Sequence, residues 1–219
     1  MKIRELFETQ LTRGPAMDLS NKNLTSLQGL HIPDIIEGNF YCGRNKLTSL
    51  QYGPTKVGTD FRCNKNRLTS LEFGPKEVNG NYECFGNVLT SLQYGPTEVG
   101  GNFYCAGNLL SSLQYCPTRV GGNFDCYENQ LTSLQGIHKQ FRSGYIKGQI
   151  WLSNNPITSH ILGLLLIPEL KFIGYSKGNA SSSCYDAIEI INKHLEGDRN
   201  VIACQRELIQ AGLKEFARL

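Results

Sequence analysis

Eight cysteines carry most of the reactive chemistry that this 219-residue sequence offers. Cysteine side chains can bind zinc, form disulfides or act as thiolate nucleophiles. A zinc site needs close pairs such as Cys-x2-Cys, which the sequence does not contain. Five cysteines instead follow a phenylalanine or tyrosine by two residues, at a fixed spacing: Cys42, Cys63, Cys84, Cys105 and Cys126. Because residues two apart on a strand share one face, this cysteine ladder is predicted to pack in a core as small apolar side chains.

The residues that alternate with the cysteine ladder offer a different chemistry. On a strand they point to the opposite face, where packing does not require aromatic or charged side chains. Tyrosine and tryptophan are enriched at protein-binding hot spots, so this face is predicted to bind another protein. The candidate binding residues, expected on the concave face of a curved sheet, are Tyr41, Arg62, Glu83, Phe85, Tyr104, Asp125, Tyr127 and Trp151. In the alternative interpretation, the aromatic residues pair across strands only to stiffen a sheet.

The histidines do not form a catalytic or metal-binding set. They fall in irregular or terminal segments and lack the spacing of metal ligands: His31, His138, His160 and His194. We therefore expect a protein that has no metal ion and no cofactor and is not an enzyme.

A sequence repeat specifies the elements that would position these residues. The motif Leu-Thr-Ser-Leu, in one copy with a second Ser in place of Thr, starts at Leu24, Leu47, Leu68, Leu89, Leu110 and Leu131. From Leu47 onward, successive copies are 21 residues apart. A period of this length is typical of a solenoid, in which each repeat packs only against its neighbours.

Within each repeat, the order apolar-x-apolar-x-x-Asn-x-Leu resembles the strand segment of leucine-rich repeats, from about Met17 to Phe172. This resemblance implies a buried ladder of asparagines that cap the turn after each strand: Asn45, Asn66, Asn87, Asn108, Asn129 and Asn155. The short repeat is most similar to those of bacterial secreted effectors and tailed-phage proteins. Pro and paired Gly residues exclude a regular helix from the return segment of each repeat, which is expected to be extended.

The expected fold is a curved leucine-rich-repeat solenoid with a parallel β-sheet of about eight strands over residues 16–175, the last strand lying within 167–172. Residues 1–15 are expected to form a cap with an amphipathic helix over 2–12. Residues 176–219 are expected to contain two helices, one from Cys184 to Leu195 and one capped by Asp198 and running to about Ala217. These helices either cap the solenoid or dock a partner or a second copy of the chain.

One alternative function is catalytic. The segment Cys184-Tyr185-Asp186 resembles the Cys-x-Asp motif of secreted effector ubiquitin ligases, which also join short leucine-rich repeats to a catalytic domain. The resemblance implies thiol transfer through Cys184, whose pKa a helix N-terminus would lower. That catalytic domain is several-fold longer than the roughly 40 residues that follow the connector here, too few to preorganise such a site.

Charge and hydropathy limit the remaining function classes. The formal net charge is +3 without a run of five like charges, which argues against both nucleic-acid and membrane binding. Nucleic-acid binding is the third alternative, and it would require a basic stripe, whereas the outward positions mix acidic and basic residues. The most apolar stretch, residues 161–167, is much shorter than the roughly 20 residues that span a bilayer. Without a recognisable export signal, a cytoplasmic protein is expected, in the host cytoplasm if a phage encodes it. The sequence favours a non-catalytic protein-binding module, and the phage resemblance implies that it binds or inhibits a host protein, such as one used in defence.

Overall fold

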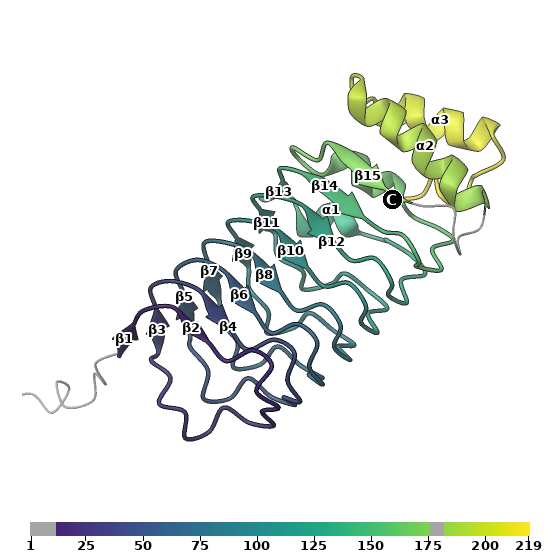
Figure 1. Ribbon diagram of the computed structural model, residues 1–219. Coiled ribbons are helices and arrows are strands. Elements are labelled where there is room, and N and C mark those ends of the chain that lie inside the picture. The colour runs from purple at the N-terminus through teal and green to yellow at the C-terminus, as the bar shows by residue number, and fades with distance from the viewer. Residues whose placement is uncertain (1–11, 176–181) are drawn as a thin grey trace, which may run out of the picture.

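The computed structural model describes residues 12–175 and 182–219. The chain winds into an elongated stack of turns that leads from β1 at one end to two helices at the other (Figure 1). Successive turns add parallel strands to two sheets. This architecture confirms the solenoid with a helical C-terminal cap that the 21-residue period predicts.

The longer sheet has eight strands, most of them two residues long. They are β2 (Met17–Asp18), β4 (Phe40–Tyr41), β6 (Phe61–Arg62), β8 (Tyr82–Glu83), β10 (Phe103–Tyr104), β12 (Phe124–Asp125), β14 (Gln149–Trp151) and β15 (Phe172–Gly174). Phe103 pairs with Phe124, and Tyr104 pairs with Asp125. The constant repeat length therefore places each residue beside its equivalent in the next turn.

A second, seven-stranded sheet lies in the segments for which the sequence predicts only an extended backbone. Its strands are β1 (Arg13–Gly14), β3 (Ile35–Ile36), β5 (Lys56–Val57), β7 (Glu77–Val78), β9 (Glu98–Val99), β11 (Arg119–Val120) and β13 (Tyr145–Ile146). From β5 to β11 the second residue of each strand is buried and the first is exposed. Exposed charges pair across neighbouring strands, as Arg119 Nη1 does with Glu98 Oε1 at 2.8 Å.

Aromatic, leucine and cysteine side chains fill the interior of the turns. The ring of Phe61 lies between those of Phe40 and Tyr82, and Phe103 and Phe124 continue the stack with neighbouring centroids 4.9 to 6.0 Å apart. All five side chains are buried, as are the five cysteines two residues further along the chain. The repeat thus stacks like side chains on like side chains through the whole core.

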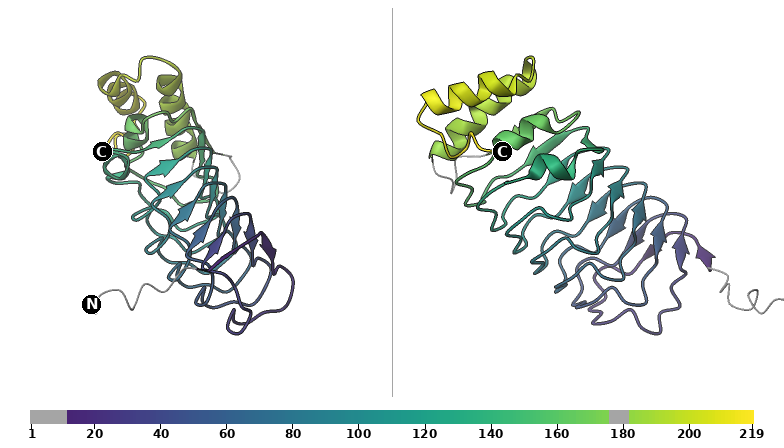
Figure 2. Two further views of the ribbon diagram at one scale, coloured as in Figure 1. Left: turned by 90° about the vertical axis from the view of Figure 1, so that its left-hand side faces the viewer. Right: turned by 180° about the vertical axis from the view of Figure 1, so that it is seen from behind.

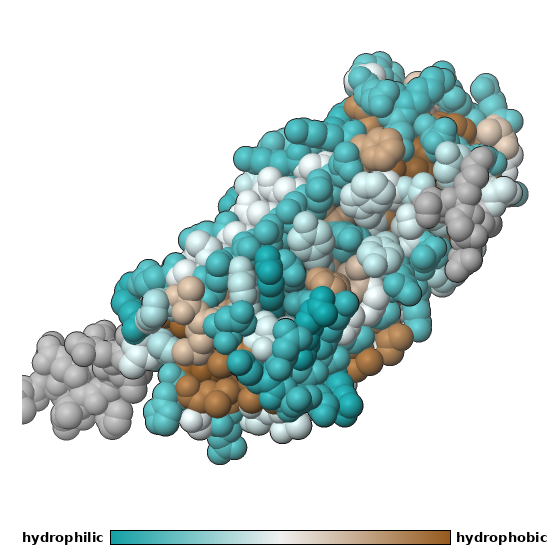
Figure 3. All heavy atoms as spheres, viewed as in Figure 1, coloured by the Kyte–Doolittle hydropathy of each residue, from teal (hydrophilic) through white to brown (hydrophobic). Residues whose placement is uncertain are grey.

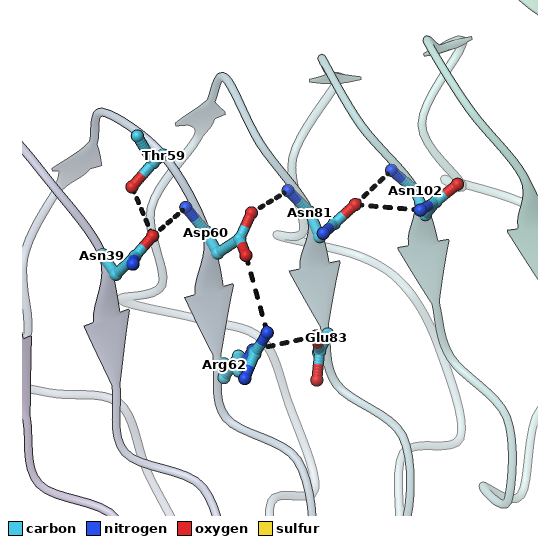
Figure 4. A network of polar contacts seen from close by, with 7 residues as sticks. All are labelled: Asn39, Thr59, Asp60, Arg62, Asn81, Glu83 and Asn102. Atoms are coloured by element: carbon cyan, nitrogen blue, oxygen red, sulfur yellow. Dashed lines mark hydrogen bonds and ion pairs between the residues drawn. The ribbon is translucent and has the colours of Figure 1, made fainter.

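A polar ladder forms the corner between the two sheets. The side-chain oxygen of Asn39 accepts from Asp60 N at 3.0 Å, and Asp60 accepts from Asn81 N at 2.8 Å (Figure 4). Asn81 and Asn102 continue the pattern with the backbone N–H of the next turn. Each side chain therefore ties one corner to the next, which explains why a polar residue recurs before each strand of the longer sheet.

Within the described residues, four helical segments lie toward the C-terminal end. They are α1 (Ile137–Gln140), the 3₁₀ helix η2 (Leu162–Leu166), α2 (Ser182–Glu196) and α3 (Val201–Gln210). Helices α2 and α3 cover the end of the stack (Figure 2). Cys184, Ile188 and Ile191 are buried residues of α2 in the same apolar core as Ile173 of β15.

The last repeat and the helices differ from the predictions in their boundaries. The eighth strand is Phe172–Gly174, whereas the sequence places it within residues 167–172, so the two ranges share only Phe172. Asn200, whose side chain accepts from Ala203 N, caps α3 instead of Asp198. Gly212, with a left-handed φ of 78°, follows the end of α3, so this helix stops well before Ala217.

At the N-terminal end, the predicted helix over residues 2–12 lies almost entirely outside the described residues. Arg13–Gly14, within the predicted cap 1–15, form a strand. No helix within residues 12–175 and 182–219 has the length and apolar character needed to cross a membrane.

Side chains from the helical cap form hydrogen bonds with the backbone of the last strand and of the segment before it. Asn192 of α2 accepts from Ile173 N at 2.8 Å and donates to Ile173 O at 2.9 Å. Arg199 donates to the backbone oxygens of Ile167 and Leu170. An exposed parallel edge would leave the backbone groups of Ile173 open to pairing with another chain, so Asn192 closes the edge of β15, and Arg199 holds the segment that leads into this strand.

Candidate protein-binding face

The outer face of the longer sheet, defined here as the side that points away from the core, carries the predicted binding residues. Tyr41, Arg62, Glu83, Tyr104, Asp125 and Trp151 occupy equivalent positions on the six successive strands β4 to β14. Phe85 lies two residues after Glu83, and Tyr127 lies two residues after Asp125. The face of the molecule seen in Figure 3 is mainly hydrophilic, with paler and brown side chains between the hydrophilic ones.

The first group on this face surrounds Arg62. Its guanidinium carbon lies 4.4 Å from the ring centroid of Tyr41, and its Nε lies 2.9 Å from Glu83 Oε1. That N–H is not aligned with the carboxylate, so the contact is an ion pair and not a well-formed hydrogen bond. A second carboxylate oxygen, Oδ2 of Asp60, lies 3.6 Å from Nη2 of Arg62 (Figure 4).

Burial changes the acidity of Glu83. Desolvation raises the pKa of this carboxyl above its ordinary value, and the positive charge of Arg62 opposes that shift. The folded protein thus keeps an acidic group half-buried beside a cation that it supplies itself.

The second group encloses an open hollow, named here the Trp151 hollow. It has a volume of about 460 Å³ and is lined by Tyr104, Asn123, Asp125, Tyr127, Trp151, Ser153 and Asn154. The indole of Trp151 lies across Gly174, where an added Cβ would come within 2.2 Å of the ring. Trp151 and Tyr127 remain 40% and 41% exposed, so the hollow presents aromatic surface to solvent.

Asp125 lies between Tyr104 and Trp151 in the row of paired strands. Its Oδ1 accepts a hydrogen bond from Tyr127 N at 3.1 Å. Burial raises the pKa of the Asp125 carboxyl, and this hydrogen bond opposes the rise. Burial also raises the pKa of Tyr104, with further contributions from the charges of Glu83 and Asp125.

The structure therefore gathers the predicted binding residues into two groups and leaves one apart. Tyr41, Arg62 and Glu83 form the first group. The second group contains Tyr104, Asp125, Tyr127 and Trp151. The remaining residue, Phe85, lies beside Lys65, whose Nζ is 6.0 Å from the ring centroid.

The asparagine ladder connects each turn to the preceding one. Asn66 donates to Cys63 O in its own turn and to Cys42 O in the preceding turn, both at 3.0 Å, and accepts from Leu47 N at 2.9 Å. Equivalent contacts to two turns are made by Asn45, Asn87, Asn108, Asn129 and Asn155. These amides are occupied within the solenoid, so they belong to its framework and not to a binding surface.

All eight cysteine side chains are buried, and none of them forms a disulfide. Burial raises the pKa of Cys42 to about 12, and it raises the pKa of Cys63, Cys84, Cys105 and Cys126 as well. No group of three or more His, Cys, Asp or Glu side chains suited to a metal ion occurs in the described parts of the chain.

Cys184 lies in the first turn of α2. The sequence predicts a lowered pKa for this thiol, but its pKa is raised. Desolvation raises it, and a side-chain hydrogen bond with Tyr175 only partly opposes the shift. The Cys184 side chain is fully buried between α2 and the end of the solenoid. Thiolate chemistry is therefore disfavoured at this position.

A second row of aromatic residues was not predicted as a surface feature. Tyr52, Phe73, Tyr94 and Tyr115 follow the Leu-Thr-Ser-Leu motif at one repeat position. Their exposed fractions are 49% to 53%, and all four adopt left-handed backbone conformations with φ of 64° to 69°. The recurring aromatic before Gly-Pro or Cys-Pro was the available sequence signal, but its exposure depends on the turn conformation. We call this row the edge stripe.

No protein-family model matches the chain, and no curated protein matches it in sequence.

Proposed function

We propose that this chain is a non-catalytic protein-binding module whose partner docks on the outer face of the longer sheet. Such a module works by occupying or recruiting a surface of its partner, which requires neither a nucleophile nor a metal ion. A parallel solenoid suits this role because it presents a long, regular row of side chains on a rigid framework.

The observation that supports the proposal is the composition of the Trp151 hollow. Two aromatic side chains remain about 40% exposed there, and the carboxyl between Tyr104 and Trp151 has a raised pKa. Packing of the solenoid requires neither feature, because the core on the other side of the sheet is already filled by Phe124 and Ile150. Exposed aromatic groups and perturbed acids concentrate at functional sites.

The class of partner comes from the repeat itself. The resemblance of the 21-residue unit to repeats of tailed-phage proteins favours a host protein as the partner, bound or inhibited by the module. The choice of a host protein as the partner rests on this sequence resemblance alone.

Affinity capture from a bacterial lysate tests the proposal. The wild-type protein is compared with Tyr104→Ala/Trp151→Ala, which removes two rings from the outer face. The matched control is Tyr94→Ala/Tyr115→Ala, which removes two rings from the edge stripe. We expect a captured protein to be kept by the control and lost by the outer-face variant, with all three proteins folded by circular dichroism.

The other outcomes place the site elsewhere. A captured protein that both variants keep would move binding to the helical cap. One that only the edge-stripe variant loses would assign binding to that stripe, and either result would overturn the outer-face proposal.

A further inference from the structure

Arg62 reveals which ligand chemistry the outer face accommodates. This side chain lies over the ring of Tyr41, with its guanidinium carbon 4.4 Å from the centroid, and forms ion pairs with Glu83 and Asp60. An arginine is therefore held on this face by an aromatic ring on one strand and a carboxylate on another. Cation–π contacts and ion pairs of this kind reinforce each other when the cation is partly removed from water.

The Trp151 hollow has the same chemical parts, and no cation of the described residues lies in it. It contains the carboxylate of Asp125 between the rings of Tyr104 and Trp151. Tyr127, two residues after Asp125, also lines the hollow. Among the described residues, no salt bridge involves Asp125, and none of the cation–π contacts involves these three rings. Asp125 Oδ1 is occupied by Tyr127 N–H, and its other oxygen accepts no hydrogen bond within the described parts of the chain.

Charge complementarity therefore identifies the missing component. A half-buried carboxylate with a raised pKa is stabilised by a nearby positive charge. Exposed aromatic faces attract the same charge through their quadrupoles. An anionic ligand would be repelled by Asp125, and a purely apolar ligand would leave this carboxylate desolvated without a partner.

We propose that the Trp151 hollow receives an arginine side chain of the partner protein, stacked on the aromatic rings and paired with Asp125. Arginine fits better than lysine because its planar guanidinium can stack on a ring and donate to a carboxylate at the same time. The volume of about 460 Å³ accommodates one such side chain with water. This inference rests on the proposed protein-binding function and specifies the chemistry of its central contact.

The chain offers a direct reporter for the test, because Trp151 is its only tryptophan. The indole N–H resonance of the ¹⁵N-labelled protein is followed during titration with three amidated N-acetyl amino acids: arginine, lysine and citrulline. Citrulline has nearly the shape of arginine but no charge. We expect arginine to shift the resonance with an affinity about tenfold above that of citrulline, with lysine in between.

Two matched variants localise the effect. Asp125→Asn keeps the shape of the side chain and an acceptor for Tyr127 N–H but removes the charge, so the preference of arginine over citrulline should disappear. Glu98→Gln removes one negative charge from the second sheet, where Glu98 pairs with Arg119, and should leave the preference unchanged. Equal responses to arginine and citrulline in the wild type, or a preference that survives Asp125→Asn, would overturn the inference.

The probe experiment needs no partner, so its failure can be separated from failure of the proposed function. If capture of a partner depends on Tyr104 and Trp151 while the probes do not discriminate, the outer face binds protein and the arginine assignment is wrong. In a second case, the hollow selects arginine but capture of the partner does not depend on Tyr104 and Trp151. The partner then binds elsewhere, so both the outer-face proposal and the arginine assignment are wrong.

Discussion

Tyr82 occupies the position that phenylalanine holds in the neighbouring turns at Phe40, Phe61, Phe103 and Phe124. Its hydroxyl is buried and has no hydrogen-bond partner among the described residues. Gly74 leaves the space for it, since an added Cβ there would lie 3.1 Å from the hydroxyl oxygen. A buried polar group without a partner destabilises the folded state.

We therefore expect Tyr82→Phe to raise the free energy of unfolding by about 1 kcal/mol. Chemical denaturation followed by far-ultraviolet circular dichroism measures the change. Tyr94→Phe, at the exposed edge stripe, is the matched control and should shift stability by less than about 0.5 kcal/mol. A loss of stability in Tyr82→Phe would show that the hydroxyl has a partner, such as a buried water.

The acidity of Asp125 gives a pH-dependent prediction. Burial raises the pKa of this carboxyl from its ordinary value of 3.8, so the folded protein holds the proton more tightly than the unfolded chain does. The ionised carboxylate therefore lowers the free energy of unfolding above the raised pKa, and this penalty disappears as the pH falls through that pKa toward 3.8.

Asp125→Asn should accordingly be more stable than the wild type at pH 7, and the difference should shrink as the pH falls through that window. Thermal unfolding at several pH values measures the difference. Glu98→Gln controls for the loss of one negative charge. A difference that does not change with pH would assign the stability effect to packing and not to ionisation.

At the scale of secondary-structure elements, the hydrogen bonds between α2 and β15 are made by one side-chain amide. Asn192 both accepts from and donates to the backbone of Ile173, and both residues are buried. Asn192→Ala leaves a backbone N–H and a C=O without partners in an apolar environment. We expect a loss of about 2–4 kcal/mol in the free energy of unfolding.

Denaturation of Asn192→Ala beside Glu196→Ala, an exposed change on the same helix, measures this contribution. The control should remain within about 0.5 kcal/mol of the wild type. Equal stability of the two variants would mean that water reaches the edge of β15 and replaces the amide.

The sequence predicts some of these secondary-structure elements and misses others. Alternation of Phe103 and Cys105 with Tyr104 predicts which residues face the core and which face outward, because the pleat has a period of two. Strands of the second sheet such as Glu98–Val99 bury only one side chain and stand between a proline and a glycine, so no alternation marks them in the sequence. The end of α3 depended on the backbone conformation of Gly212, which an apolar stripe continuing to Phe216 concealed.

The binding face shows a similar division. The row of outward residues follows from the repeat, but the pairing of Arg62 with Glu83 depends on side-chain conformations that no spacing specifies. The hollow beside Trp151 likewise requires Gly174 on the next strand, and the predicted eighth strand did not reach that residue.

At the scale of the whole molecule, α2 and α3 protect the last strand from contact with other chains. Truncation after residue 175 would uncover Ile173, Leu164 and Leu165, which lie in the same buried cluster as the helices, and would free the edge of β15. We expect the truncated chain to melt at a lower temperature and to self-associate, because an exposed parallel edge with adjacent apolar surface favours pairing.

Calorimetry and light scattering after size-exclusion chromatography measure both effects. Removal of residues 218–219 alone is the control and should leave the mass and the melting temperature near those of the full chain. A monomeric truncated chain with an unchanged melting temperature would show that the solenoid closes without its helices.

The asparagine ladder also has a consequence for inheritance. Each amide connects only adjacent turns, so one 21-residue unit can be gained or lost by recombination between similar stretches of the coding sequence without interrupting the ladder. Adding one unit between β8 and β10 would separate Arg62 from the Trp151 hollow by one further strand spacing, about 4.8 Å. The distance between two recognition points on this protein can thus evolve in fixed steps, while every residue that makes a contact stays the same.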